Sequence, residues 1–406
     1  MSKRKDTLAS WILPAGFEDM GPQQAAALEG KRRELLDLFA SWGYRQVIPP
    51  MLEHLEGLLT GSAIDLDLET WKVLDQASGR VLGFRSDMTP QMARIDVQMA
   101  RGDEARRLSY AGTVLRARPD ALGGSRAPFQ VGAEMFGVAS ADADLEILSL
   151  MVESVQRCCP GSELVLDLGH VAIPQCLAEA CGLGQQDREE LLRFLERKAW
   201  PDLRQLLQAD AVPPQQTEAF RALSELHGDH EILDRARQRF ASYPVILRAL
   251  EELDFVWKVL AQRYPQLCIR ADLAEMQGHR YHTGMLFALF SPQRGAAIAR
   301  GGRYDGVGKA FGRYRPATGF SLDLRPLLRD LSEERNSPRV WAPGGSDPSL
   351  WQAIQDLRAQ GYTVVQDLAG GVPAQPLPAG FDACLVVEGG RWTLAGREPE
   401  FPFSAS

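Results

Sequence analysis

Residues 284–302, GMLFALFSPQRGAAIARGG, contain two apolar runs separated by the polar turn sequence SPQR. Two such runs around a short turn are typical of a β-hairpin. The residues just before them, LCIRADLAEM at 267–276, and an earlier stretch, ELVLDLGHV at 163–171, also read as β-strands. Together these runs predict a largely antiparallel sheet as the base of the fold.

A stretch of different composition separates the strand-rich halves of the chain. Residues 174–262 are rich in Leu, Glu, Arg and Gln at helical spacing, which predicts a helical insertion in an α+β core. After a linker-like stretch, RNSPRVWAPGGSDPS, the run SLWQAIQDLRAQG predicts a helix, and YTVVQDL and DACLVVEGG predict strands. We therefore expect a core over residues 1–335 and a small α/β remnant over 336–406.

A further helix is predicted near the N-terminus, over residues 22–42. Pro22 suits a first helical turn, and Gly43 suits the stop. Apolar residues recur there at three- and four-residue steps on one face, namely Ala25, Leu28, Leu35, Phe39 and Trp42. The run YRQVI at 44–48 then predicts a strand that ends at two prolines.

The composition of the chain argues against several classes of function. The chain has 406 residues and a formal net charge of -8, which does not favour nonspecific nucleic-acid binding. Its six cysteines form no CxxC pair, so we expect reduced thiols and no metal site. No window approaches the ~20 apolar residues of a membrane span, and the apolar run at 11–13 is shorter than the about 7–15 residues of a secretory signal. A soluble, cytoplasmic protein is expected.

The stretch FRSDMTPQMAR at 84–94 offers a carboxylate, Asp87, and a hydroxyl, Thr89, beside Pro90. A carboxylate at such a place could receive the ammonium group of a ligand. The alternative is structural, because Asp87 or Thr89 could cap a helix that begins at Pro90.

The stretch GTVLRARPDALGGSRAPFQVGAEMFG at 112–137 reads as two strands around a Gly-Gly turn. Gln130 and Glu134 share one strand face because strand side chains alternate, and Arg116 and Arg118 also share a face. Converging arginines suit a phosphate or a carboxylate. The alternative is an exposed, solvated hairpin.

Two more stretches carry polar side chains among small residues. AEMQGHRYHTGMLFALF at 274–290 places Tyr281 and His282 between glycines and then becomes apolar, as the wall of a ligand pocket does. GGRYDG at 301–306 surrounds Tyr304 with small residues. It is neither a Walker loop nor a dinucleotide-binding fingerprint.

Taken in order, these motifs resemble the catalytic core of histidyl-tRNA synthetases, which have the class II synthetase fold. GYRQVIPPMLE resembles that family's first motif, FRSDMTP its LRPEGT stretch, and VLRARP with RAPFQVGAEMFG its second motif. GHRYHTG resembles its histidine signature, and GGRYDG with PATGFSLDL resembles the lead-in to its third motif. The resemblance covers about residues 8–330. It implies an antiparallel sheet flanked by helices, and a dimer formed through the first motif.

The resemblance also implies a pocket that binds histidine. The positions that correspond to the family's ligand residues are Asp87, Thr89, Arg116, Gln130, Glu134, Tyr281, His282 and Tyr304. Asp87 stands where the family has a Glu for the α-amino group. Glu134 facing an imidazole would favour the N–H-donating form of that ring.

The departures from the family concern the arginines that hold a triphosphate during adenylation. Arg116 matches one of them, but Gln277 and Pro326 stand at the other two positions. The neighbouring Arg325 would point elsewhere, because one residue turns a helix by about 100°. Gln cannot replace a charged, bidentate group. We therefore expect no catalytic residue and no cofactor, and a pocket that holds histidine without activating it.

This combination is similar to the family of ATP phosphoribosyltransferase regulatory subunits. The resemblance implies a non-catalytic partner of the short-form catalytic subunit, which activates that subunit and relays inhibition by histidine in the first step of histidine biosynthesis. Residues 336–406 hold four basic and seven acidic side chains, a net charge of -3. A segment of that charge is a poor tRNA platform.

Two alternatives stay open from the sequence. A divergent but active histidyl-tRNA synthetase would catalyse histidine-dependent ATP–pyrophosphate exchange. A synthetase-like regulator of another partner would bind histidine or tRNA without affecting phosphoribosyltransferase.

Overall fold

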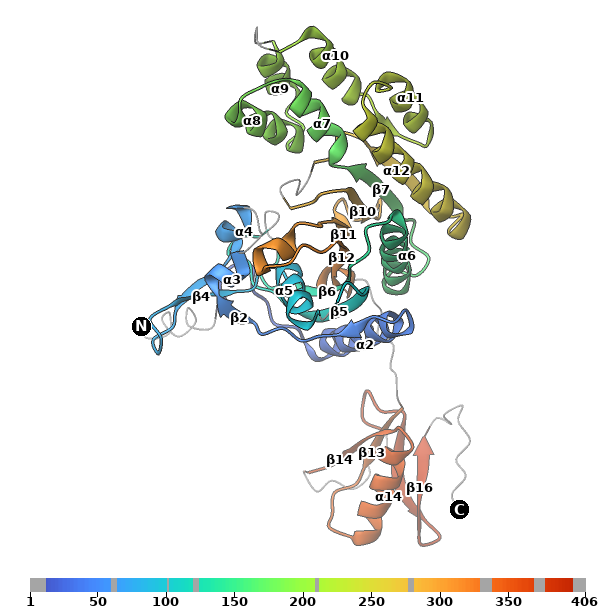
Figure 1. Ribbon diagram of the computed structural model, residues 1–406. Helices are drawn as coiled ribbons and strands as arrows, with labels where there is room; N and C mark the ends of the chain where they lie inside the picture. The colour runs from blue at the N-terminus through green and yellow to red at the C-terminus, as the bar shows by residue number, and fades with distance from the viewer. Residues whose placement is uncertain are drawn as a thin grey trace, which may run out of the picture. The chain divides into compact units, whose positions relative to one another are not determined.

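Figure 1 shows the computed structural model of the chain, which describes residues 12–59, 64–100, 102–119, 124–208, 212–276, 281–328, 338–368 and 377–396. The chain divides into two compact units, Met1–Asp330 and Leu331–Ser406. The domain boundary expected at residues 335–336 lies outside the described residues, as does Gln277.

The larger unit is built on a nine-stranded sheet of order β1-β5-β6-β12-β11-β10-β7-β9-β8. Its strands are β1 (Arg45–Gln46), β5 (Arg106–Thr113), β6 (Phe129–Phe136), β7 (Val165–His170), β8 (His227–Gly228), β9 (Cys268–Asp272), β10 (Met285–Phe290), β11 (Ala297–Arg303) and β12 (Ala317–Asp323). Neighbouring strands are antiparallel except β1 with β5 and β7 with β9. The predicted hairpin is confirmed, because β10 and β11 pair in antiparallel with Leu286 opposite Gly302.

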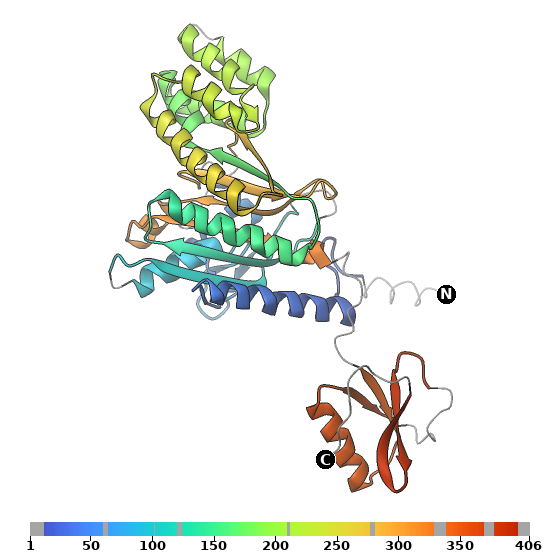
Figure 2. The same ribbon diagram turned by 90° about the vertical axis from the view of Figure 1, so that its right-hand side faces the viewer.

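Two long helices, α2 (Pro22–Ser41) and α6 (Ala141–Cys158), pack against one face of this sheet (Figure 2). Phe39 of α2 is fully buried there and meets Phe320 of β12 edge to face, with 5.9 Å between ring centroids. Burying one such side chain contributes about 1.5–3 kcal/mol, so this packed face stabilises the sheet.

The opposite face carries α5 (Thr89–Met99), whose Met92 is fully buried beside Tyr110 and Tyr304. Alternation along β6 explains the division, since Ala133 joins the core beneath α2 and α6 while the next residue, Glu134, faces Thr89 of α5. The alternation therefore places Glu134 on the side of the sheet that α5 covers.

The helical block comprises α7 (Ala172–Ala180), α8 (Gln185–Glu196), α9 (Trp200–Leu207), α10 (Pro214–Leu223), α11 (Glu231–Arg239) and α12 (Pro244–Arg263). It leaves the sheet after β7 and returns to it at β9, with which β7 pairs in parallel. Figure 1 shows it as one body beyond that sheet edge. Among the described residues, no helix has the length and apolar character to cross a membrane.

A second, three-stranded sheet follows the first helix. It consists of β2 (Leu52–His54), β3 (Lys72–Leu74) and β4 (Val81–Phe84) in the order β2-β4-β3, with the short helices α3 (Leu55–Leu59) and α4 (Ile64–Glu69). The strand expected at 44–48 is shorter than predicted, because only Arg45–Gln46 pair as β1. Tyr44 instead turns back to donate its N–H to Phe39, and the prolines at 49 and 50 cannot extend a ladder.

The smaller unit has a four-stranded sheet of order β14-β13-β15-β16 and one helix. Its elements are β13 (Arg339–Ala342), α14 (Pro348–Ala359), β14 (Thr363–Gln366), β15 (Ala383–Glu388) and β16 (Arg391–Gly396). Its core includes Val340, Ile354 and Leu385. The interpretation of 335–349 as a linker is wrong for β13, which lies there and pairs in parallel with both β14 and β15.

Candidate ligand-binding site

Glu134 is the centre of the site on the polar side of the sheet. It lies on β6 and is 1% exposed. Its Oε1 accepts hydrogen bonds from Thr89 Oγ1 at 3.0 Å and from the Tyr110 hydroxyl at 3.1 Å. Its Oε2 accepts a short hydrogen bond from the Tyr304 hydroxyl. One buried carboxyl group therefore gathers hydroxyls from α5, β5 and the end of β11.

The environment of Glu134 changes its protonation. Burial is the main cause that raises the pKa of Glu134 to about 8, the hydrogen bond from Tyr304 opposes the rise, and the nearby charge of Asp87 adds to it. Burial also holds the pKa of Tyr304 well above its ordinary value, so that hydroxyl stays a donor. The carboxyl group can therefore present either a proton or a lone pair to a ligand near neutral pH.

Asp87 and Gln130 form a second polar group beside Glu134. Gln130 Nε2 donates to Asp87 Oδ1 at 2.8 Å and to Ser321 Oγ at 3.1 Å, and Gln130 Oε1 accepts from the Met88 N–H at 3.1 Å. Asp87 Oδ1 also accepts from the Thr89 N–H at 3.3 Å. The helix begins at Thr89 rather than Pro90, and Met88 is its N-cap residue, so neither Asp87 nor Thr89 caps it. The charge of Asp87 acts on Glu134.

Tyr281 and His282 form one wall. The Tyr281 ring stacks on Tyr304 with 5.0 Å between centroids, and it meets His282 edge to face at 5.4 Å. The Tyr281 hydroxyl is buried and has no hydrogen-bond partner among the described residues. An orphaned hydroxyl in a polar site is a position where a ligand group can bind.

His282 is a neutral member of this wall. Burial lowers its pKa to about 4, against the opposing effects of the Arg303 carbonyl and Asp87. Its Nδ1 lies 3.3 Å from the Arg303 carbonyl oxygen, which can only accept, so Nδ1 carries the proton.

Glycines make room for the carboxyl group. A Cβ at Gly319 of β12 would lie 1.5 Å from Glu134 Oε2, and a Cβ at Gly132 would lie 2.5 Å from the Tyr110 hydroxyl oxygen. No side chain fits at either place without displacing the site, so both positions require glycine.

Arg116 lies at the margin rather than on Glu134. Its Nε donates to the Ser86 carbonyl at 3.5 Å, and its charge acts on Asp323, which pairs across the sheet with Gln130. Arg118, the second arginine of that predicted face, is exposed.

Tyr110 and Ser321 were not predicted as site residues. Tyr110 is fully buried on β5, directly opposite Gly132, and Ser321 pairs with the same glycine from β12. The available signal was strand alternation, because residues opposite Gly132 share the face of Glu134.

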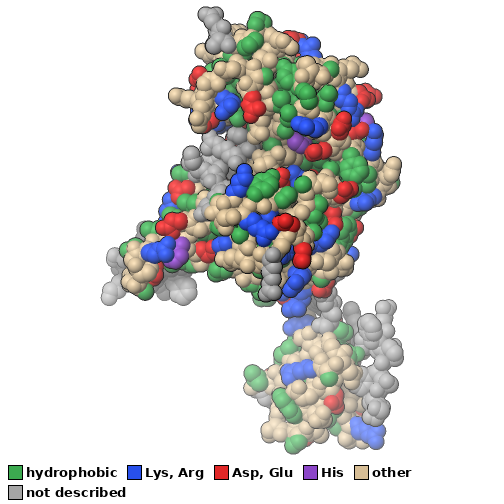
Figure 3. Space-filling model, viewed as in Figure 1, with side chains coloured by type: hydrophobic (Ala, Val, Ile, Leu, Met, Phe, Trp, Pro, Cys, Tyr) green, Lys and Arg blue, Asp and Glu red, His purple; other side chains and the backbone are tan. Residues whose placement is uncertain are grey.

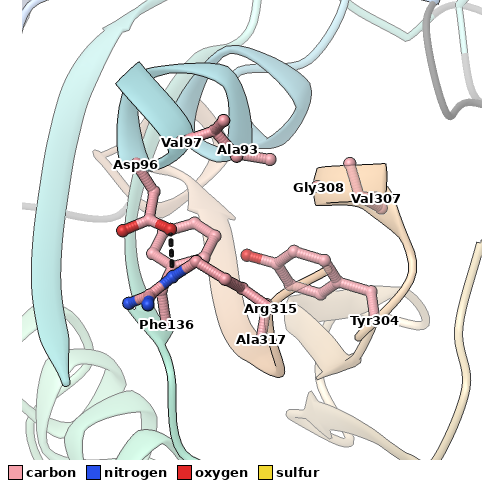
Figure 4. Close-up of a pocket in the computed structure, with 9 residues that line it drawn as sticks. All are labelled: Ala93, Asp96, Val97, Phe136, Tyr304, Val307, Gly308, Arg315 and Ala317. Carbon is pink, nitrogen blue, oxygen red and sulfur yellow. Dashed lines mark ion pairs between the residues drawn. The ribbon is translucent and has the colours of Figure 1, made fainter. Parts of the chain in front are cut away.

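Figure 4 shows a hollow on the other side of Tyr304, between α5 and the 3-10 helix η1 (Val307–Phe311). It is too small to admit a water molecule. Arg315 and Asp96 form a buried ion pair there, with 2.7 Å between Nε and Oδ2, although the N–H does not point along that line. Arg106 pairs with the same carboxylate at 2.7 Å. This hollow is a packing feature beside Tyr304.

Among the described residues, no group of three or more His, Cys, Asp or Glu side chains is arranged to hold a metal ion. On the face of the larger unit seen in Figure 3, basic and acidic side chains are interspersed. The polar groups of the site are therefore hydroxyls and amides that form hydrogen bonds around the two carboxyl groups of Glu134 and Asp87.

The comparisons with known proteins identify the family and the fold. The sequence matches the histidyl-tRNA synthetase family model over residues 16–327. The fold is similar to the crystal structure of an ATP phosphoribosyltransferase regulatory subunit/histidyl-tRNA synthetase from Bacillus halodurans, with a TM-score of 0.78, 26% identity and coverage of 90% of this chain and 95% of that one. A histidyl-tRNA synthetase from a Nostoc species shares the fold with a TM-score of 0.75 at 17% identity, covering 93% and 91% of the two chains. Fold and site together define a class II, histidyl-tRNA synthetase-like protein.

Curated relatives show to which family within this class the chain belongs. The ATP phosphoribosyltransferase regulatory subunit of Ectopseudomonas mendocina is 46% identical, over 96% of this chain and 98% of the relative. That of Thioalkalivibrio sulfidiphilus is 47% identical, over 89% and 92%. Residues 337–395 match the model of the ATP phosphoribosyltransferase subunit HisZ C-terminal domain. The chain belongs to the family of ATP phosphoribosyltransferase regulatory subunits.

Proposed function

We propose that this chain is a non-catalytic regulatory subunit that activates a short-form ATP phosphoribosyltransferase catalytic subunit and relays feedback inhibition by histidine. The observation that carries the proposal is the buried Glu134, held by Thr89, Tyr110 and Tyr304, in a chain whose full-length relatives are named as such subunits. A regulator needs a ligand pocket and a partner, and it needs no chemical step of its own.

Histidine fits the polar groups of this pocket. Glu134 would take an imidazole N–H, and the carboxylate of Asp87 would take the α-ammonium group. Gln130 holds Asp87 in place through its 2.8 Å hydrogen bond. The orphaned hydroxyl of Tyr281 offers one more donor beside Tyr304. Arg116 and His282 complete the proposed set at its edges.

We also propose that the chain does not adenylate histidine. Gln277 and Pro326 stand where synthetases have arginines. Pro326 lies in the short helix α13 (Leu324–Leu327). At the start of this helix the backbone N–H of Arg325 donates to Asp323 Oδ1 at 3.1 Å. A removed electrostatic donor of this kind costs ~10²–10³ in rate. Two such losses support a binding role.

Self-association is the remaining part of the proposal. The three-stranded sheet exposes apolar side chains, among them Leu74 and Val81, which are cross-strand partners 62% and 42% exposed. Ile48, in the stretch that resembles the first motif, is 83% exposed. An exposed apolar group of this kind is typical of an interface. A second copy of this chain is its proposed partner.

The first test mixes this chain with a short-form catalytic subunit and measures complex formation by light scattering. It also measures histidine-dependent ATP–pyrophosphate exchange by this chain alone. We expect a complex and no exchange. Exchange activity would favour a divergent synthetase, and histidine binding without a complex would favour a regulator of another partner.

A further inference from the structure

Lys198 occupies a strained position in the helical block. It follows the last turn of α8 with φ at +52°, and it is the one non-glycine residue with positive φ in the described part of the chain. The turn is a Schellman-type helix end, in which the Lys198 N–H donates to Leu195 and the Ala199 N–H to Phe194. Glycine usually fills this place because it has no Cβ. A lysine at this strained position points to a role for its side chain.

The side chain of Lys198 reaches out of the helical block. Its Nζ lies 2.5 Å from Asp272 Oδ2 and 3.4 Å from Glu275 Oε2. Burial opposes its charge, but the hydrogen bond and charge of Asp272 and the charge of Glu275 outweigh it and raise the pKa of Lys198. The ammonium group therefore joins the helical block to the turn that follows β9.

That turn precedes the site residues Tyr281 and His282 in the sequence, and residues 277–280 between them lie outside the described part of the chain. Glu275 precedes Tyr281 by six residues in the sequence. Glu275 also packs on the backbone of β7, because a Cβ at Gly169 would lie 2.9 Å from Glu275 Cβ. The end of β7 in turn holds β10, with Gly169 opposite Leu286 and the Val171 N–H donating to Gly284 at 3.1 Å.

Asp272 and Glu275 also act on a third carboxyl group, that of Asp167. Asp167 lies on the same face of β7 as Gly169. Burial, followed by the charges of Asp272 and Glu275, raises the pKa of Asp167 to about 6, while the charge of Lys198 opposes the rise. Lys198 and Arg270 thus offset the repulsion among three carboxyl groups, and Lys198 is the one that binds two of them directly.

We propose that Lys198 is a positioning residue for the ligand site. By binding Asp272 and Glu275 it holds the turn that packs on β7, and β7 in turn holds the start of β10, which follows Tyr281 and His282. The proposal rests on the proposed histidine site and adds a residue from the helical block to it. Lys198 acts through other residues and does not touch the ligand.

The test uses the full chain with Lys198→Gly, Lys198→Met and Lys198→Arg. Lys258→Met is the matched control, since Lys258 is also in the helical block but pairs only within α12, with Asp254 at 2.7 Å. Calorimetry gives the Kd for histidine, and thermal unfolding gives Tm. We expect Lys198→Gly and Lys198→Met to weaken binding about three- to tenfold, and Lys198→Arg and the control to stay within about twofold of wild type.

Stability separates positioning from a merely structural role. Lys198→Gly loses an ion pair but relieves the backbone strain, so its Tm should stay within about 2 °C of wild type. Unchanged histidine affinity in Lys198→Gly and Lys198→Met would overturn the proposal. It would also be overturned if each variant lost affinity only in proportion to a loss of Tm, because that would indicate general destabilisation. A wild-type chain that binds no histidine would instead contradict the proposed function itself.

Discussion

Glu134 has an unusual balance of forces for a carboxyl group. It is buried among the hydroxyls of Thr89, Tyr110 and Tyr304, and burial is the main cause that raises its pKa to about 8. In the unfolded chain the same group ionises near ~4.3. Between these values the native state binds more protons than the unfolded state, so this group makes stability fall as pH rises through that window.

Replacing the carboxyl group by an amide removes this pH dependence. Without ligand, Glu134→Gln should be more stable than wild type at about pH 8.5, on the order of 1–3 kcal/mol, and should lose that advantage towards about pH 5. Urea unfolding at both pH values measures the difference. An advantage that is the same at the two pH values would contradict the assigned pKa.

Ligand binding gives a second prediction at this scale. Glu134→Ala and Asp87→Ala should each weaken histidine binding by about 1.5–3 kcal/mol, the usual cost of losing a hydrogen bond to a charged group. Isothermal calorimetry measures the change, and circular dichroism checks the fold. Glu163→Ala, at an exposed position before β7, is the control. Unchanged affinity in both site variants would mean that histidine does not bind here.

The site residues that belong to sequence motifs were predictable from the sequence. Thr89, Tyr304 and Glu134 are joined by hydrogen bonds in the structure, and Gln130 bonds to Asp87. Tyr110 was not predictable in this way. Its role depends on lying opposite Gly132 on the neighbouring strand, and strand register is a tertiary property. Arg116 was grouped with the same residues, yet it bonds to Ser86 at the margin.

At the scale of elements, the three-stranded sheet makes a prediction about assembly. Leu74→Glu places a charge opposite Val81 on its exposed apolar face. Burying that charge in an interface costs several kcal/mol, while the monomer keeps its exposed edge in water. We expect light scattering to give a dimer for wild type and a folded monomer for Leu74→Glu. A variant that stays dimeric would place the interface elsewhere.

Elements with a continuous apolar face were predictable from the sequence. The helix α2 and the hairpin of β10 and β11 follow from spacing alone, because each repeats its pattern over several residues. β8 is two residues long, and β13 lies in a stretch with Pro338 and Pro343. Such short strands exist because of the partners they pair with, and no local pattern marks them.

At the scale of the whole molecule, the two units have separate cores. A chain ended after Asn336 should therefore fold, remain dimeric and bind histidine with wild-type affinity. Thermal unfolding, light scattering and calorimetry of this shortened chain check the three points. Aggregation of the shortened chain would show that residues 337–406 complete the core of the larger unit.

We propose that histidine acts on the catalytic subunit through the site around Glu134. The most direct measurement is the rate at which a short-form catalytic subunit forms phosphoribosyl-ATP from ATP and phosphoribosyl pyrophosphate, with wild-type chain or with Glu134→Ala, over a range of histidine concentrations. We expect both chains to raise the rate, and we expect Glu134→Ala to need at least about tenfold more histidine for inhibition. Equal inhibition of the two mixtures by histidine would contradict it.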